Sequence, residues 1–315
     1  MRGTREIKRR IKSVQSTQKI TRAMEMVAAA KLRRAEERAE AARPYAKSIN
    51  NSIARILENT IGIKSPLMEA RDSTQRCLVV FSSDRGLCGS YNTNVLRRAV
   101  LEAEKYPGEE VSIVVIGRKA RDFFRRRDYN IIREFLDIED RPGIGRAQEL
   151  VAYLSGLFDE GKTGEVHLIY NEFVNVMIHH PRCLQLLPVE TEDKAGAEEK
   201  AEAEEKAEAV EGERQTKEEQ QRGEAAAEEL IYQFEPEPEI VLEALLSRLL
   251  NSLVLTAFLE AKASELGSRM TAMRTATENA KDMIARLTLE YNKARQASIT
   301  QEILEIVNTS EALSK

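Results

Sequence analysis

The chain has 315 residues, of which 42% are hydrophobic, 32% charged and 5% aromatic, and it carries a net charge of −4. This length allows one to three domains with a substantial core, and high charge with few aromatic side chains favours long, solvated helices. The three cysteines form no CxxC pair and the three histidines complete no ligand set, so the sequence predicts no cofactor, no metal site and no disulfide framework.

The net charge conceals two segments of opposite sign. Residues 1–48 carry fourteen Lys or Arg against five Glu, whereas residues 192–229 carry fifteen acidic residues against six basic ones. Since the whole chain carries −4 and residues 192–229 carry −9, the remainder is basic by +5. A basic remainder predicts acidic partner surfaces.

An N-terminal coiled-coil helix is predicted in residues 1–58. From Thr4 to about Ala42, apolar or small side chains recur three, four or seven residues apart, as expected for one face of a helix. These positions are Ile7, Ile11, Val14, Thr21, Met24, Ala28, Leu32 and Ala35. Pro44 is expected to end or kink the helix, and a second helical piece from Ile49 to Leu57 follows. The basic N-terminus lacks the apolar core of a signal peptide.

Residues 75–190 are predicted to form an α/β domain that interrupts the helical ends of the chain. Short, β-branched runs bounded by turn residues predict strands at Cys77–Phe81, Val111–Gly117 and Val166–Tyr170. Helical stretches alternate with them at Tyr91–Glu104, Arg118–Arg127 and Arg146–Glu160. This alternation predicts a Rossmann-like, mostly parallel sheet.

Residues 192–229 form an acidic, low-complexity insert that is nearly free of large apolar side chains. Such a stretch cannot bury enough surface to fold alone. A charged loop and a solvated, partly formed helix both remain open.

The C-terminal segment, residues 240–313, predicts a second long helix of about 110 Å. Its seam recurs at four-three spacing through Leu266, Met270, Met273, Thr277, Ala280, Ile284, Leu287, Tyr291, Ala294 and Ser298. A seam with this period requires a partner helix, so the two terminal helices are expected to pair antiparallel as a rod. The apolar window at residues 240–259 is interrupted by Glu243, Arg248 and Asn251. Their spacing predicts a solvent-exposed helix face in a soluble protein and not a membrane span.

GLFDEGKT, at Gly156–Thr163, matches the phosphate-binding loop pattern G-x-x-x-x-G-K-[ST]. That chemistry needs a strand leading into the loop and a helix leaving it. Here a predicted helix enters and a predicted strand leaves, so Gly161 is interpreted as a helix C-cap. A nucleotide enzyme that uses Lys162 and Thr163 is therefore an alternative rather than the expectation.

SSDRGLCGSYN, at Ser82–Asn92, follows the first predicted strand, where open α/β sheets hold ligands. Asp84 and Arg85 could contact an anion or a partner, and a turn fixed by an internal Asp–Arg or capping interaction explains them about as well. No combination of nucleophile, base and orienting acid is apparent. A scaffold that binds nucleic acid through the basic N-terminal helix is a further alternative, but no aromatic platform accompanies the charges.

Three segments together resemble the gamma subunit family of the rotary F-type ATP synthases. They are EIKRRIKSVQSTQKITRAMEMVAAAKLRRA at Glu6–Ala35, SSDRGLCG at Ser82–Gly89 and YNKARQASITQEILEIV at Tyr291–Val307. The resemblance implies a non-catalytic central stalk whose rotation couples ion flow through a membrane rotor to ATP synthesis or hydrolysis. It also implies a peripheral location on the cytoplasmic side of the cell membrane.

The resemblance implies contacts with the alpha and beta subunits of the catalytic ring, the epsilon subunit and the membrane rotor ring, and none with nucleic acid. The residues implied to contact the beta subunit are Met24, Arg295, Gln296 and Thr300. Those implied to contact the rotor ring are Tyr232 and Glu235, beside Phe234 where the family often has tyrosine.

The acidic insert departs from most bacterial members of that family. It lies about where photosynthetic relatives carry a regulatory insertion, but it contains no cysteine, which excludes thiol switching within it. An electrostatic restraint on ATP hydrolysis or rotation and a passive solvent loop are both left open.

Overall fold

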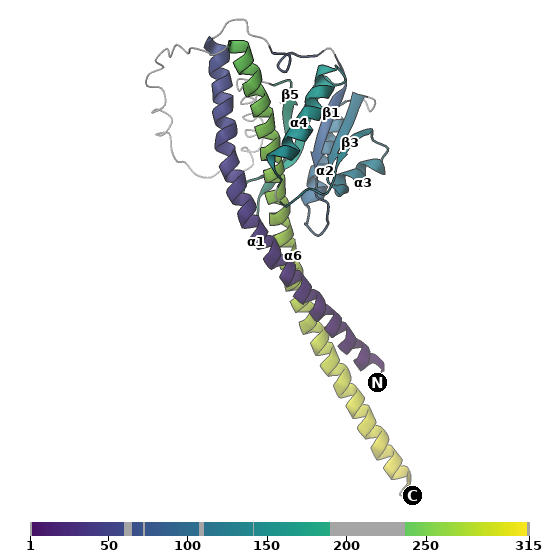
Figure 1. Cartoon of the computed structure of the whole chain (residues 1–315). Coiled ribbons are helices and arrows are strands. Elements are labelled where there is room, and N and C mark those ends of the chain that lie inside the picture. Colours follow the sequence, from purple (N-terminus) through teal and green to yellow (C-terminus); the bar gives the residue numbers. More distant parts are fainter. Residues whose placement is uncertain are drawn as a thin grey trace, which may run out of the picture.

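The computed structural model describes residues 2–59, 65–71, 73–106, 110–140, 142–189 and 237–313. Two helices, α1 (Arg2–Asn59) and α6 (Pro238–Leu313), lie side by side along a rod, with an α/β domain gathered at one end (Figure 1). The chain termini lie toward the other end. The predicted fold class is confirmed, whereas the acidic insert at residues 192–229, together with Tyr232 and Glu235, lies outside the described residues.

The heptad seam lies where the sequence predicts it. Along the distal part of α6, each predicted seam residue is half-buried between exposed neighbours. These residues are Ile284, Leu287, Tyr291, Ala294 and Ser298. On α1, Ile7, Ile11 and Val14 are half-buried in the same way. Side chains that recur every 3.5 residues continue to face the partner helix along a coiled coil.

The expectation that Pro44 ends the first helix is wrong, because α1 continues through this proline to Asn59, and the alternative expectation of a kink at Pro44 stays a prediction. An interior proline costs about 3 kcal/mol through a lost hydrogen bond and a clash with the preceding turn. Three isoleucines beyond it, Ile49, Ile53 and Ile56, are buried in the core. Burying each is worth about 2 kcal/mol, which outweighs the cost of the exposed proline.

The sheet has five strands in the order β3-β2-β1-β4-β5. The strands are β1 (Arg76–Phe81), β2 (Val111–Ile116), β3 (Ile131–Phe135), β4 (Glu165–Phe173) and β5 (His179–Leu187). All neighbouring pairs are parallel except β4 and β5. The three predicted strands are present, and the two missed strands, β3 and β5, lie at the edges, where polar residues interrupt the apolar pattern.

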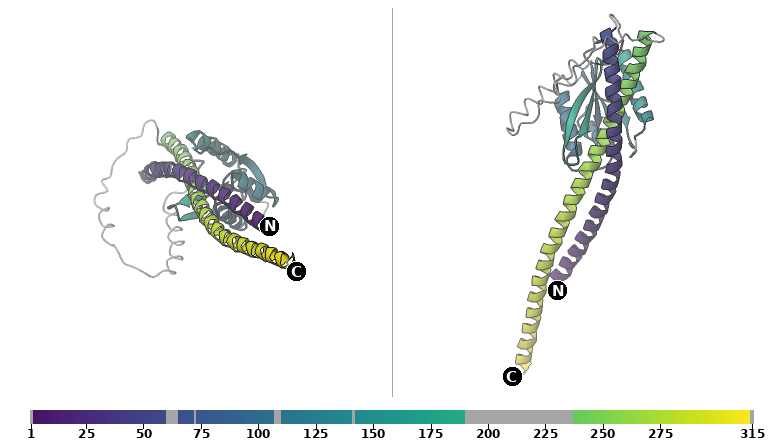
Figure 2. Two further views of the ribbon diagram at one scale, coloured as in Figure 1. Left: turned by 90° about the horizontal axis from the view of Figure 1, so that it is seen from below. Right: turned by 90° about the vertical axis from the view of Figure 1, so that its left-hand side faces the viewer.

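Side chains that alternate along β1 and β2 face two different cores. The Val79 side packs with α4 (Ile144–Asp159) and α6, through residues such as Leu154 and Leu246. The Val80 side packs with α2 (Tyr91–Ala103) and α3 (Arg118–Arg125). The sheet therefore lies between two helical layers, one of which contains the rod itself (Figure 2).

Part of α6 is long and apolar enough to cross a membrane by composition alone. In this chain 39% of that window is buried, along the helix face that packs against the rest of the protein. Five of its side chains are at most 3% exposed and belong to the larger core, namely Leu242, Leu246, Leu249, Leu250 and Val254. Their burial accounts for the apolar face that this stretch turns toward the core.

Candidate functional site: the bare shaft and its neck

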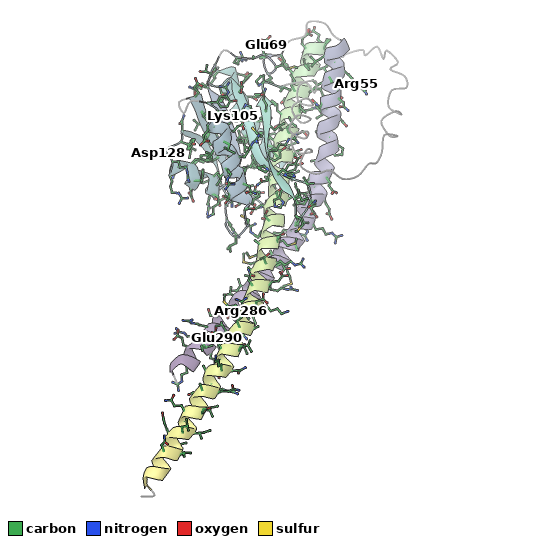
Figure 3. The ribbon with its side chains drawn as sticks, turned by 180° about the vertical axis from the view of Figure 1, so that it is seen from behind. Arg55, Glu69, Lys105, Asp128, Arg286 and Glu290 are labelled. Carbon is green, nitrogen blue, oxygen red and sulfur yellow. The ribbon has the colours of Figure 1, made fainter. Side chains whose placement is uncertain are left out.

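Beyond the α/β domain, α1 and α6 continue alone, and α6 extends further than α1 (Figures 1 and 2). We call this part the shaft, comprising residues 2–28 of α1 and 270–313 of α6. Figure 3 shows Arg286 and Glu290 on it, far from Arg55 and Glu69 at the opposite end of the molecule. The domain leaves most of the shaft uncovered in the described structure.

The structure places Arg295, Gln296 and Thr300 together near the end of α6, and all three are exposed. Gln296 and Thr300 stand one helical turn apart, and the Thr300 hydroxyl donates to the Gln296 carbonyl oxygen at 3.0 Å. The Arg295 and Gln296 side chains thus project into solvent from two adjacent positions. They form a polar surface available to a partner.

Large apolar side chains surround this polar surface. Ile299, Ile303, Leu304, Ile306 and Val307 are 46–68% exposed. Exposed apolar residues concentrated on one segment mark an interaction surface, and a lone helix gains little stability without tertiary contacts. The end of α6 is therefore a candidate interaction surface.

Met24 lies apart from this group, on α1 near the domain. It is half-buried and lines a cleft of about 860 Å³ together with Ala23 and Val27. The cleft opens between α1, α6 and the ends of β1 and β2, where Phe81 and Ile116 contribute apolar lining. The predicted beta-contact residues thus occupy two separate places along the shaft.

An ion network crosses this cleft. We call the region around the cleft, where the α/β domain meets the shaft, the neck. Asp140, in the loop between β3 and α4, lies 2.5 Å from the Lys31 amine on α1 and 3.4 Å from the Lys262 amine on α6. Lys262 also pairs with Glu265 at 3.1 Å, and Glu265 pairs with Arg269 at 2.6 Å. Three chain segments are thereby joined by charge.

The hydrogen bond from Lys31, aided by the charge of Lys262, lowers the pKa of the Asp140 carboxyl despite partial burial. Sequence reasoning missed this network. Spacing along α6 could have indicated a charged stripe at Lys262, Glu265 and Arg269. Nothing local could have assigned Asp140 to it, because its partners are 109 and 122 residues away along the chain.

The loop at Ser82–Asn92 is held by its own hydrogen bonds. The Asp84 carboxylate accepts the backbone N–H groups of Arg118 at 3.1 Å, Asp137 at 3.3 Å and Ile138 at 2.9 Å. This carboxylate therefore ties the loops that follow β1 and β3 to the start of α3. Capping, rather than anion binding, explains Asp84.

The phosphate-loop match at Gly156–Thr163 is a connection from helix to strand, as predicted. α4 ends at Asp159, Gly161 has a φ of +69°, and β4 begins at Glu165. Thr163 is buried, and its hydroxyl oxygen lies 2.8 Å from the carbonyl oxygen of Glu165 and 3.1 Å from that of Gln75, either of which can accept its single hydrogen. This geometry does not form a phosphate cradle.

Comparison with known proteins identifies the family. A family model described as ATP synthase matches residues 3–313. The ATP synthase gamma chain of Heliobacterium modesticaldum is 41% identical over 313 residues, covering 99% of this chain and 100% of that protein. This chain belongs to the ATP synthase gamma chain family. Another gamma chain, from Acetobacterium woodii and described as sodium ion specific, is 40% identical and covers 99% of both chains.

Chains of two solved structures have a fold similar to that of this chain. A chain of the Euglena gracilis mitochondrial ATP synthase aligns over 99% of this chain and 94% of its own, with a TM-score of 0.64 at 20% identity. A chain of the Tetrahymena thermophila mitochondrial ATP synthase, from a central stalk and c-ring structure, covers 82% of this chain at 26% identity with a TM-score of 0.58. Both chains therefore share the fold of this chain.

Proposed function

We propose that this chain is the rotating central shaft of an F-type ATP synthase. In this role it couples ion flow through the membrane rotor to conformational change in the catalytic ring. The observation that carries the proposal is the bare end of α6, a helix exposed on all sides whose apolar residues require enclosure. The solved structure from Tetrahymena is likewise described as a central stalk with a c-ring.

The shaft itself performs no chemistry in this proposal. The alpha and beta subunits enclose it, and the asymmetric shaft pushes each beta subunit in turn through its conformational cycle. Arg295, Gln296 and Thr300 contact the beta subunit near the tip, and Met24 contacts it at the neck. The α/β domain meets the epsilon subunit, while Tyr232 and Glu235 meet the rotor ring, which places the chain peripherally on the cytoplasmic side of the cell membrane.

The composition of the shaft suits this motion. Small and flexible seam residues such as Met273, Thr277 and Ala280 let the two helices approach closely. The surplus of Lys and Arg in residues 1–48 suits acidic partner loops. A long, stiff rod whose surface does not lock one register can transmit torque while it slides past successive partners.

A native pull-down tests the function. The tagged chain is isolated from its own membranes, its companions are identified and ATP hydrolysis is measured. The proposal predicts an ATP-hydrolysing assembly that contains a three-to-three catalytic ring. Recovery of the chain alone or with nucleic acid would contradict it.

The acidic insert has a separate role in this account. We propose that residues 192–229 restrain rotation electrostatically by meeting basic surfaces of the shaft or of the epsilon subunit. Deleting residues 195–227 is expected to raise the ATPase rate and to weaken its salt dependence in the assembled enzyme. An unchanged rate and an unchanged salt response would leave the insert as a passive loop.

A further inference from the structure

A row of four polar side chains crosses the α/β domain on the face covered by α2. Arg76 of β1 is paired across the sheet with Glu165 of β4. His167 follows two residues later on β4 and therefore points to the same face. Ile169 continues this alternation and is paired with Cys183 of β5, which brings the Cys183 thiol next to His167.

Along this row, a carboxylate, an imidazole and a thiol lie close to one another. The Glu165 Oε2 atom lies 3.1 Å from Arg76 Nε and 3.0 Å from His167 Nε2. The other imidazole nitrogen, His167 Nδ1, lies 3.9 Å from Cys183 Sγ. The row thus runs from a fixed positive charge, through an anion and a base, to a sulfur nucleophile.

The Arg76 guanidinium and the Glu165 carboxylate set the orientation of the imidazole. Burial opposes ionisation of Glu165, but the hydrogen bonds from His167 and Arg76 outweigh it and lower the pKa of this carboxyl. An ionised Glu165 accepts a hydrogen bond from Nε2–H. The unprotonated Nδ1 then faces the thiol and can accept its proton, which is the arrangement of an activated cysteine.

The other two cysteines differ from Cys183 in both surroundings and exposure. Cys77 is 0% exposed, and burial raises its pKa to about 12. Cys88 is 2% exposed, and burial likewise raises its pKa. Cys183 is half-buried on β5 and is the only cysteine of the chain with an imidazole within hydrogen-bonding distance in the described structure.

We propose that Cys183 is a reactive thiol, activated by His167 and Glu165, that forms mixed disulfides with low-molecular-weight disulfides. Because Cys183 is half-buried, we expect it to admit a small reagent and to hinder a protein-sized one. In the reaction His167 Nδ1 takes the thiol proton and the thiolate attacks one sulfur of the small disulfide. The disulfide bond of the reagent breaks, a new bond to Cys183 forms, and the departing thiolate recovers the proton from His167.

The test measures the reactivity of all three cysteines in the purified, assembled enzyme. Hydroxyethyl disulfide is added between pH 6 and 9, and adducts on the peptides that contain Cys77, Cys88 and Cys183 are quantified by mass spectrometry. Cys183 is expected to react at least about tenfold faster than either buried cysteine, and dithiothreitol should remove the adduct. No adduct at Cys183, or equal rates at the three sites, would overturn the proposal.

Variants separate activation from mere accessibility. In His167→Gln the adduct at Cys183 should form about tenfold more slowly at pH 6.5, and half-maximal rate should require a higher pH. Glu165→Gln keeps the hydrogen-bonding shape but removes the charge, so a smaller slowing is expected. His180→Gln is the matched control, because it removes an exposed imidazole from β5, the strand that carries Cys183. It should leave the pH profile of adduct formation at Cys183 unchanged. Superposed pH profiles for His167→Gln and the unaltered enzyme would refute activation by His167.

Discussion

At the scale of single residues, the neck depends on close packing between backbone segments as much as on its charges. Gly117, which follows β2, has a φ of +88°, a conformation that side chains disfavour. A Cβ atom built there would lie 2.4 Å from the Ser82 carbonyl oxygen. Glycine therefore lets the end of β2 meet the end of β1, where Ser82 and Asp84 hold the surrounding loops.

Gly117→Ala should lower the free energy of unfolding of the full chain by about 3 kcal/mol, through backbone strain and displacement of Ser82. Chemical denaturation measures this change. Gly143→Ala is the matched control, since Gly143 has a φ of −92° and no heavy atom lies within 4 Å of the added carbon. Equal destabilisation by the two substitutions would contradict the packing account.

The Asp140 network has a pH signature. Because the pKa of Asp140 is lowered in the folded chain, its ionic contacts stabilise that state above the ordinary pKa of 3.8. This contribution is lost as pH falls through the depressed folded value. Asp140→Asn should therefore reduce stability at pH 7 and have little effect near pH 2, as followed by denaturation at each pH. If the stability difference between Asp140→Asn and the unaltered chain grew as the pH fell, the lowered pKa of Asp140 in the folded chain would be refuted.

At the scale of the elements, the shaft is a coiled coil with a weakly apolar seam. Thr21 is 9% exposed, and its hydroxyl oxygen lies 2.8 Å from that of Thr277 on the other helix. A polar pair inside a seam favours one register, because any axial slip separates the partners. We interpret this contact as the register marker of the shaft.

A double-mutant cycle with Thr21→Val and Thr277→Val measures that contact. Valine keeps the shape of threonine, so each single change removes the hydroxyl with little loss of packing. The coupling free energy between the two positions is expected to be about 1 kcal/mol, as for a net hydrogen bond. Thr21→Val with Thr288→Val is the control pair, because Thr288 is exposed and donates to its own helix. A coupling indistinguishable from the control would remove the register role.

The spacing of apolar residues predicted the helices with a repeating seam. It failed where contacts between distant segments determine whether a helix or strand forms. The α6 seam from Leu266 to Ser298 follows directly from the 3.5-residue period. The passage of α1 through Pro44 could not be predicted, because it depends on the burial of Ile49, Ile53 and Ile56 against distant segments. Edge strand β5 was missed because HHPRCLQLL lacks a continuous apolar run.

The residues of the candidate site likewise fall into those that the sequence could indicate and those that only the structure shows. Arg295, Gln296 and Thr300 could be proposed only from a resemblance, since exposed polar residues on a helix carry no local signal of contact. Asp140 and the alignment of Cys183 with His167 appear only once the sheet order and strand register are known. Sequence reasoning therefore gave the scaffold in outline and left the cross-chain polar contacts to the structure.

At the scale of the whole molecule, the anchored and bare parts of α6 serve different purposes. Its first half is buried against the α/β domain, and its last turns are exposed. A change on the bare part should therefore affect coupling and leave folding intact. The two effects can be measured separately in the same variant.

Gln296→Ala tests this separation. ATP synthesis by the assembled enzyme should fall several-fold, whereas the melting temperature of the chain should shift by less than about 2 °C, because an exposed side chain contributes little to stability. Gln301→Ala makes the same change on another side of the helix and should cause a smaller loss. Parallel losses of thermal stability and synthesis in Gln296→Ala would argue against a contact role.

Rotation itself tests the central claim most directly. With the catalytic ring fixed to a surface and a visible probe attached to the α/β domain, ATP is added and the angle of the probe is followed. The account predicts continuous rotation in one direction that stops when ATP is exhausted. Sustained ATP hydrolysis by the same immobilised assemblies with a stationary probe would contradict it.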